Sequence, residues 1–346
     1  MLDYIIVGAG LSGICVTETL REREKSFVVF ENGSQNSSTV AGGIYNPVIL
    51  KRFTLAWNAD EQLEPAILFY RDLEEKLGIP IIEELPIYRK FNSIEEQNNW
   101  FEALDKPLLA PFLDPSLVKD INKNIPSQFS FGKVNHTGRV NTSLLISAYR
   151  EFLDLGDNLR NSAFEYAKLE LKDDHIIYEN LKARKIIFSE GYGMSTNPFF
   201  SFLPLHGNKG EYLIIKSEDL KLDVAVKSSV FILPLGNDLY KVGATYDNRD
   251  TGKDPTEAAR ETLISQVSRM ITCDFEVVDQ VAGIRPSTRD RKPLVGQHPE
   301  YQQLYCCNGF GSRGVLMAPT IARALLRFIE NGQKLDPEID LNRFII

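Results

Sequence analysis

Apolar and polar residues in the first thirty positions follow the pattern of a strand, a helix and a second strand. Leu2–Val7 is a short apolar run of strand type, and Phe27–Phe30 is another. Between them, Ile14, Val16 and Leu20 recur at helical spacing. The pattern therefore predicts a strand–helix–strand unit at the N-terminus.

Helical and strand patterns continue to alternate further along the chain. Apolar residues from Leu63 to Leu77 follow one face of a helix that Gly78 and Pro80 end. Further helices are expected over 141–155, 254–270 and 318–330. Strands are expected over 185–188, 211–216, 228–233, 239–245 and 275–284, the last ending at Arg285-Pro286. Between 80 and 126, prolines and charged residues break every pattern, so only short irregular elements are expected.

Three glycines follow the first strand as Gly8-x-Gly10-x-x-Gly13, and Glu31 follows the second strand. Gly8 permits a tight turn, Gly10 lets the backbone approach a pyrophosphate, and Gly13 packs the helix against the strand. The helix N-terminus offers free N–H groups to phosphates, and Glu31 accepts hydrogen bonds from the ribose hydroxyls of an adenosine. The alternative is a glycine-rich turn in another kind of α/β protein, which would not require an acid at this distance. The motif favours NAD or FAD over NADP, because an acid disfavours a 2′-phosphate.

The order of elements predicts an α/β protein, α+β overall. A Rossmann-type domain is expected to be interleaved with a domain built on an antiparallel sheet. Residues 1–52, 131–206 and 283–346 are assigned to the nucleotide-binding domain. Residues 53–130 and 207–282 are assigned to the second domain, which would bind the substrate.

Composition narrows the class of protein. A chain of 346 residues suits two domains, and a formal net charge of −8 with a pI of 5.3 argues against a surface that binds phosphate backbones. No apolar run approaches the roughly 20 residues of a membrane span, and the N-terminal run is a strand rather than a signal peptide. Four cysteines without a CxxC motif and four scattered histidines favour a cytoplasmic protein with reduced thiols and no metal site.

Two segments near the C-terminus add a second group of motifs. They are Gly283-Ile284-Arg285-Pro286 and Gly311-Ser312-Arg313-Gly314-Val315-Leu316. The second is a glycine-rich turn that leads into a helix, an arrangement that stabilises anions such as a reduced flavin. With the N-terminal motif, the Ala41-Gly42-Gly43 loop and Lys209-Gly210-Glu211, the chain resembles the D-amino-acid oxidase/glycine oxidase family of FAD-dependent amine oxidoreductases. Residues 311–319 are most similar to the flavin domain of the bifunctional tRNA 5-methylaminomethyl-2-thiouridine enzyme.

The resemblance implies which residues bind FAD. The ADP half is expected to lie on Gly8, Gly10, Ser12, Gly13 and Glu31, with Gly191 near the adenosine. The ribityl chain and flavin ring are expected to contact Thr39, Ala41, Gly42, Gly43 and Ile44. The pyrimidine edge of the flavin is expected to face the backbone N–H groups of Arg313, Gly314, Val315 and Leu316. No cysteine lies between Gly283 and Gly296, where the sarcosine-oxidase branch attaches its flavin, so FAD is expected to be non-covalent.

The resemblance also implies a substrate site with Arg285, Tyr45 and Ser312 as candidate catalytic residues. Arg285 matches the arginine that binds the substrate carboxylate through two parallel hydrogen bonds. The alternative is a structural arginine that pairs with a neighbouring carboxylate. Tyr45 either covers the flavin or packs its own loop. Phe231 and Ser312 replace a tyrosine and an arginine of glycine oxidase, which weakens the case for plain glycine or a D-amino acid as the substrate.

The expected reaction is oxidation of a carboxylate-bearing amine, either an amino acid or an N-substituted glycine. In the family, hydride passes to flavin N5 and the imine is then hydrolysed. Oxygen or a quinone would accept the electrons. Two alternatives remain: removal of a carboxymethyl group from a tRNA wobble uridine, against which the acidic pI counts, and a flavin-binding protein without turnover in a complex. The sequence does not predict an oligomeric state.

Overall fold

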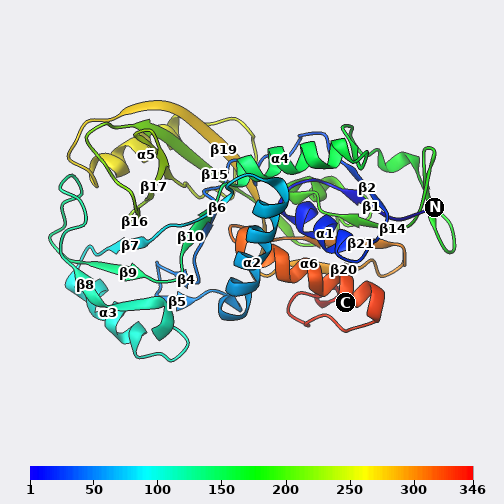
Figure 1. The fold of residues 1–346 in the computed structure, drawn as a ribbon, viewed down its shortest axis with the longest axis horizontal. Coiled ribbons are helices and arrows are strands. Elements are labelled where there is room, and N and C mark those ends of the chain that lie inside the picture. Colours follow the sequence, from blue (N-terminus) through cyan, green and yellow to red (C-terminus); the bar gives the residue numbers. More distant parts are fainter. Residues whose placement is uncertain (346) are drawn as a thin grey trace.

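Two eight-stranded sheets organise the chain, and Figure 1 shows them at opposite ends of its long axis. The structure, a computed structural model, describes residues 1–345. Helix α2 (Ala59–Leu77) lies between the two sheets in this view. The expected α/β architecture, a nucleotide-type sheet joined to an antiparallel-rich sheet, is confirmed.

The first sheet contains the N-terminal strand–helix–strand unit. Strand β1 (Leu2–Val7) pairs in parallel with β2 (Phe27–Phe30) on one side and with β14 (Leu181–Phe188) on the other. The other strands are β11 (Leu159–Arg160), β12 (Leu169–Leu171), β13 (Ile176–Tyr178), β20 (Leu294–Gln297) and β21 (Leu304–Asn308). Because β1, β2, β14 and β21 are parallel, their carboxyl ends meet at one edge. Ligands bind at this edge of open parallel sheets.

Helices and aromatic side chains cover the two faces of this sheet. Helices α1 (Leu11–Arg21), α4 (Thr142–Leu155), α6 (Gly314–Asn331) and α2 contribute to one buried cluster. The opposite face forms a second buried cluster, in which Phe188 of β14 packs against Phe164 and Phe200. Three 3₁₀ helices also occur in the part of the molecule around this sheet. They are Tyr166–Lys168, Gly191–Thr196 and Leu341–Phe344.

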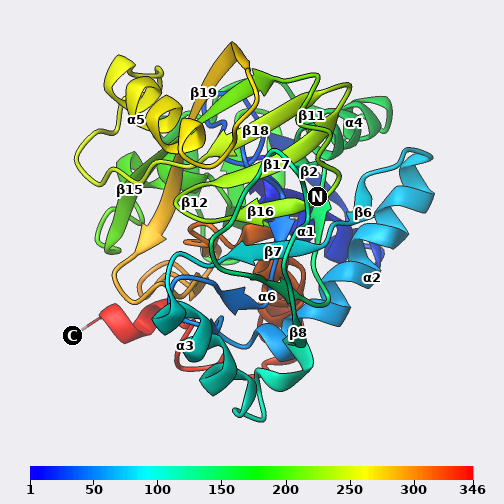
Figure 2. The same ribbon diagram turned by 90° about the vertical axis from the view of Figure 1, so that its left-hand side faces the viewer.

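The second sheet has the order β19-β15-β18-β17-β16-β7-β9-β8. Figure 2 shows it with α5 (Glu257–Ser268) above it and α3 (Ile94–Leu104) below. Its strands are β7 (Ile87–Lys90), β8 (Leu113–Val118), β9 (Phe131–Val134), β15 (Leu205–Lys216), β16 (Ala225–Lys227), β17 (Phe231–Gly236), β18 (Leu239–Gly243) and β19 (Glu276–Thr288). Leu263 and Val267 of α5 share a buried cluster with Leu213 and Val242 of the sheet. The other face is therefore left to line a cavity.

Five short strands form two further, smaller sheets. Strands β3 (Ile44–Tyr45), β10 (Gly138–Val140) and β6 (Ile82–Glu84) form a three-stranded sheet. Strands β4 (Val48–Ile49) and β5 (Thr54–Leu55) form a two-stranded one. The 3₁₀ helix Ala110–Phe112 precedes β8.

Most predicted elements are confirmed, and three differ in ways that affect the site. Strand β19 does not end at Arg285-Pro286 but continues to Thr288. It is an edge strand, where a proline nitrogen needs no partner in the ladder. Helix α6 begins at Gly314 rather than at 318, with Pro319 inside it.

The third difference concerns β9, which was assigned to the nucleotide-binding domain but pairs with β7 and β8 in the second sheet. The segment 80–126, where no regular element was predicted, supplies β7 and β8 of that sheet. Local sequence did not indicate these strands because they are short and interrupted by proline and charge. The domain boundaries proposed from the sequence remain predictions.

Candidate active site

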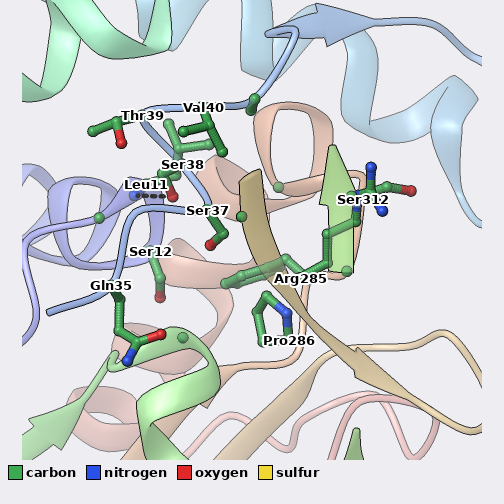
Figure 3. A pocket seen from close by; sticks show the side chains of 18 of the residues that line it. Leu11, Ser12, Gln35, Ser37, Ser38, Thr39, Val40, Arg285, Pro286 and Ser312 are labelled. Carbon is green, nitrogen blue, oxygen red and sulfur yellow. Dashed lines mark hydrogen bonds between the residues drawn. The ribbon is translucent and has the colours of Figure 1, made fainter. Parts of the chain in front are cut away.

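A cavity of about 750 Å³ runs from the carboxyl edge of the first sheet to the uncovered face of the second sheet. Its lining includes the turn after β1, the loop 34–46, the strands β15–β19 and the start of α6. Figure 3 shows the Gln35–Val40 loop beside Leu11 and Ser12, with Arg285 and Ser312 further along the cavity. Every residue proposed from the sequence lines this cavity except Gly13 and Tyr45.

The turn after β1 requires glycine at two of its three motif positions. Gly8 has a φ of +101°, and a Cβ on it would lie 2.5 Å from the Ser189 carbonyl oxygen. A Cβ on Gly13 would lie 1.9 Å from the carbonyl oxygen of Gly8, so this glycine packs the helix against the turn. Gly10 is less restricted, since its nearest neighbour would be Ser38 Oγ at 3.3 Å. Room beside Gly10 is what a close approach of pyrophosphate needs.

The N-terminus of α1 presents free backbone donors to the cavity. The Leu11 N–H donates to Ser38 Oγ at 3.4 Å (Figure 3). Within residues 1–345, the N–H groups of Ser12 and Gly13 have no backbone acceptor. The Ser12 side chain faces elsewhere, because its hydroxyl donates to the Cys307 carbonyl at 2.6 Å. Ser12 is therefore suited to bind phosphate through its backbone rather than its hydroxyl.

Glu31 lies where the carboxyl ends of β1 and β2 meet. Its carboxylate accepts hydrogen bonds from the N–H groups of Ala9 and Gly33, both at 2.6 Å. Arg150 of α4 lies 3.3 Å from the same carboxylate and also lines the cavity. These contacts hold the carboxylate in place and leave further lone pairs for ribose hydroxyls. Sequence patterns gave no signal for Arg150, which comes from a helix more than a hundred residues away.

Gly191 also lies at this end, three residues after the end of β14. Its φ is +58°, and its carbonyl accepts a hydrogen bond from Asn308 Nδ2 at 2.8 Å. The neighbouring Glu190 accepts from Tyr166 Oη at 2.5 Å and from Asn197 Nδ2 at 2.8 Å. Burial raises the pKa of the Glu190 carboxyl.

The loop that contains Thr39–Ile44 is fixed by contacts on both sides. Thr39 Oγ1 donates to the Asn36 carbonyl at 2.8 Å. Lys241 Nζ, on β18, donates to the carbonyls of Val40 at 3.0 Å and Ala41 at 3.2 Å. Burial, together with the nearby Arg139, lowers the pKa of Lys241 to about 8. The loop is thereby attached to the second sheet.

Tyr45 lies outside the cavity lining and is withdrawn as a candidate catalytic residue. It is 4 % exposed, and its hydroxyl donates to the Glu83 carbonyl at 3.3 Å. A Cβ on Gly138 of the adjacent strand would lie 1.9 Å from this hydroxyl, so the phenol fills the space above that glycine. Burial raises the pKa of Tyr45 to about 12. Of the two alternatives given for Tyr45, the structure places it in loop packing.

The glycine-rich turn before α6 offers two backbone donors rather than four. The Arg313 N–H donates to the Phe310 carbonyl and the Leu316 N–H to the Arg313 carbonyl, both at 3.0 Å. The N–H groups of Gly314 and Val315 have no backbone acceptor within residues 1–345. The contribution expected from the backbone of Arg313 and Leu316 is therefore corrected. The sequence pattern places the start of this helix at 318, four residues after its first residue in the structure, and therefore does not indicate these hydrogen bonds.

Two side chains of this turn have different surroundings. Arg313 Nη1 donates to the Asn46 carbonyl at 3.0 Å, and burial lowers the pKa of Arg313 to about 10. Ser312 is exposed on the cavity lining and remains a candidate for substrate contact.

Arg285 extends across the face of the second sheet from the edge strand β19. It pairs in register with Asn208 of β15, and its Nη1 donates to Asn208 Oδ1 at 2.7 Å and to the Thr245 carbonyl at 3.4 Å. A Cβ on Gly210 would lie 2.0 Å from Arg285 Nη2, so the guanidinium occupies the space that this glycine leaves open. The Tyr246 ring lies 5.7 Å from the guanidinium carbon. The sequence did not indicate the roles of Asn208 and Tyr246, which depend on strand register.

No carboxylate of residues 1–345 lies within 4 Å of the Arg285 guanidinium, and no acceptor of the described chain binds its Nε or Nη2. A structural arginine that pairs with a carboxylate is therefore not what the structure shows. The Nε–Nη2 edge of a guanidinium is one of the edges that meet a carboxylate with two parallel hydrogen bonds.

Comparison with known proteins identifies the family. The family model described as FAD dependent oxidoreductase matches residues 3–327. The chain belongs to this family. Glycine oxidase of Pseudomonas aeruginosa is 22% identical, with 97% of this chain and 96% of the relative covered. The tRNA 5-methylaminomethyl-2-thiouridine biosynthesis bifunctional protein MnmC of Legionella pneumophila is also 22% identical, and the match covers 96% of this chain but 55% of that protein. The crystal structure of glycine oxidase from Geobacillus kaustophilus has a TM-score of 0.80 at 19% identity, covering 99% and 97% of the two chains.

These findings confirm the expected family, enzyme class and cofactor, FAD. The residues present also fit the cofactor on their own chemistry, since two helix N-termini with free N–H groups and one fixed carboxylate line the same cavity. Among residues 1–345, no three histidine, cysteine, aspartate or glutamate side chains are grouped to hold a metal ion. Over the same residues, no helix combines the length and apolar character that crossing a membrane requires.

Proposed function

We propose that this flavoenzyme oxidises an amine that carries a carboxylate, with Arg285 binding that carboxylate. The observation that supports the proposal is that Arg285 lines the cavity while its Nε and Nη2 have no acceptor within residues 1–345. Amino acids and N-substituted glycines have the required carboxylate next to the amine. The similarity to glycine oxidase favours the same class of substrate.

Arg285 would act by orienting the substrate. Its Nη1 is held by Asn208, which fixes the plane of the guanidinium and leaves the other edge for the substrate. A carboxylate held at two points places the adjacent Cα–H in one direction, and this positioning lowers the barrier of the following step. Phe231, Leu233 and Tyr212 line the cavity nearby and would exclude water from the amine.

The cofactor would be held by the N-termini of α1 and α6 and by Glu31. The N–H group of Ser12 would bind phosphate, Glu31 the ribose, and the N–H groups of Gly314 and Val315 the pyrimidine edge of the flavin, whereas Gly13 would pack the helix against the turn. FAD, when bound, supplies the two-electron acceptor for the amine. We infer that it is non-covalent, so acid precipitation of the purified yellow protein should release flavin into the supernatant. Flavin that stays in the pellet would contradict this inference.

Anaerobic bleaching of the bound flavin tests the proposed function. A panel of amino acids and N-alkylglycines is compared with the matching amines that lack the carboxylate. The proposal expects rapid bleaching only by members with the carboxylate, and equal rates for both classes would overturn it. Reoxidation of the bleached enzyme by oxygen and by a soluble quinone then identifies the electron acceptor.

A further inference from the structure

The cavity continues beyond Arg285 along one row of residues on the second sheet. Tyr212 of β15 is in register with Gly243 of β18, Gly243 with Phe231 of β17, and Phe231 with Lys227 of β16. All four residues line the cavity, so they share one face of the sheet. Figure 2 shows β16, β17 and β18 side by side.

Lys227 stands at the end of this row, three strands away from β15. The Arg285 guanidinium lies over Gly210, which is also on β15. At about 4.8 Å between neighbouring strands, three steps separate the two strand axes by roughly 14 Å. The two cations therefore lie on one face, at separate positions along one cavity.

Within residues 1–345, Lys227 has no counter-ion. Its Nζ donates to the Ser229 carbonyl at 3.0 Å and lies 5.1 Å from the centre of the Phe231 ring. No carboxylate of residues 1–345 lies within 4 Å of it. The charged groups that affect its pKa are the cations Lys51 and Arg89, of which Arg89 is itself paired with Glu96. Burial, with a smaller contribution from these two cations, lowers the pKa of Lys227 to about 8.

The carboxylates of the cavity are found at its other end. Only Glu31 and Glu190 of the described chain line the cavity with a carboxyl group. Both lie after strands of the first sheet, and both already accept hydrogen bonds from protein donors. Placing a lysine ammonium in a half-buried site among other cations costs free energy, and an anion in the cavity would compensate for that cost.

We propose that Lys227 binds a second anionic group of the substrate, remote from the carboxylate that Arg285 binds. The substrate would be an amine with a carboxylate next to the nitrogen and a carboxylate or phosphate at the far end of a chain of several bonds. The apolar face of Phe231 would cover the connecting chain. This inference rests on the proposed function, because it requires Arg285 to hold the first carboxylate.

Matched substrate pairs test the inference by anaerobic reduction of the bound flavin in the holoenzyme. N-(carboxypropyl)glycine and N-(carboxypentyl)glycine are each compared with the analogue whose remote carboxylate is an amide, and with the corresponding remote phosphonate. The ratio of reduction rate to dissociation constant should be about 10- to 100-fold higher for at least one remote anion than for its amide. The anion with the higher ratio shows which kind of group the site takes.

Variants of Lys227 assign that preference to the residue. In Lys227→Met the remote anion and its amide should react equally, whereas Lys227→Arg should keep part of the preference. Lys216→Met provides the control, because Lys216 ends β15 and lies outside the cavity lining; it should keep the full preference.

Three results would overturn the inference, and they are distinguishable. If remote anions and amides reduce the wild-type flavin equally well, the second site is absent while the proposed function stands. If Lys227→Met retains less FAD and its substrate preference is unchanged, the lysine serves the cofactor. If no carboxylate-bearing amine bleaches the flavin, the proposed function fails and this inference fails with it.

Discussion

At the end of the cavity next to α1, the charged side chains have charged or hydrogen-bonding partners in the protein. At the end next to the second sheet, Arg285 and Lys227 have no carboxylate partner within residues 1–345. Glu31 is held by two N–H groups and Arg150, and Glu190 by Tyr166 and Asn197. At the other end, Arg285 and Lys227 contact carbonyl and amide oxygens but no carboxylate.

This difference indicates what each end binds. The first end presents backbone N–H groups and a fixed carboxylate, which suit a neutral ribose and a phosphate group placed at helix termini. The second end presents positive side chains without compensation, which suit a ligand that brings its own negative charge. On the proposed function, the chain would hold its cofactor mainly with backbone N–H groups and its substrate mainly with side chains.

The largest expected effect concerns Arg285, at the end of the cavity where the cations have no carboxylate partner within residues 1–345. Arg285→Ala removes both the charge and the two-point contact, so the rate of flavin reduction divided by the dissociation constant should fall by about 10²–10³-fold for carboxylate-bearing amines. Arg285→Lys keeps the charge but loses the two-point geometry and should be intermediate. Stopped-flow reduction under anaerobic conditions measures both variants.

Amines without a carboxylate serve as the control for Arg285. Their slow reduction should change little in the alanine variant, and the flavin spectrum should stay normal. A structural role would instead lower the melting temperature and slow both classes of amine to the same degree. That pattern would remove Arg285 from the substrate site.

The next largest effect concerns Glu31, at the end of the cavity next to α1. Glu31→Gln keeps the shape of the side chain but weakens its charged hydrogen bonds to ribose, each of which contributes about 1.5–3 kcal/mol. Titration of apoprotein with FAD should show a dissociation constant about 10- to 100-fold higher. Reduction rates of the fully loaded variant should stay close to wild type, because Glu31 lies at the end of the cavity next to α1 and Arg285 at the end next to the second sheet. Unchanged FAD affinity would show that the carboxylate serves only Ala9, Gly33 and Arg150.

The sequence predicts the first end well, because its parts are close together along the chain. A turn, a helix start and an acid within 31 residues define most of the contacts, and the backbone makes them. Gly13 shows this directly, since its contact is with Gly8 in the same turn. Arg150 of α4 and the contacts of Glu190 with Tyr166 and Asn197 come from segments outside these 31 residues and have no local signal.

The second end depends on pairings between distant segments. Arg285 was identified from a family motif, but its partner Asn208 and the space over Gly210 follow from the register of β15 and β19. Lys227 lies on a three-residue strand whose cavity-facing side is set by its neighbours β17 and β7. Tyr45 was misplaced for the same reason, since its direction depends on pairing with β10. Register between distant strands cannot be derived from local patterns.

Gly210→Ala should have a smaller effect than the substitutions of Arg285, because it shifts the guanidinium without removing it. A Cβ at this position would lie 2.0 Å from Arg285 Nη2, so the guanidinium has to move while its charge is kept. Because the arginine is flexible at its end, the fold should tolerate the change. The dissociation constant for carboxylate-bearing amines should rise about tenfold, which corresponds to 1.4 kcal/mol, and FAD affinity should not change. Equal binding by wild type and variant would show that the observed position of the guanidinium is not the one used for substrate.

The smallest expected effect concerns Lys241 of β18, which attaches the loop of Val40 and Ala41 to the second sheet by donating to their carbonyls. Its pKa is lowered to about 8 in the folded protein, while the ordinary value of 10.5 applies to the unfolded chain. Between these two values the unfolded chain binds more protons, so this lysine makes the free energy of unfolding rise with pH; below pH 8 it contributes no slope. Lys241→Met should remove that rise, which amounts to at most about 1 kcal/mol between pH 8 and 9. Urea unfolding of both proteins at pH 7, 8 and 9 measures the difference, and parallel pH dependences would show that the ammonium is not desolvated at the junction.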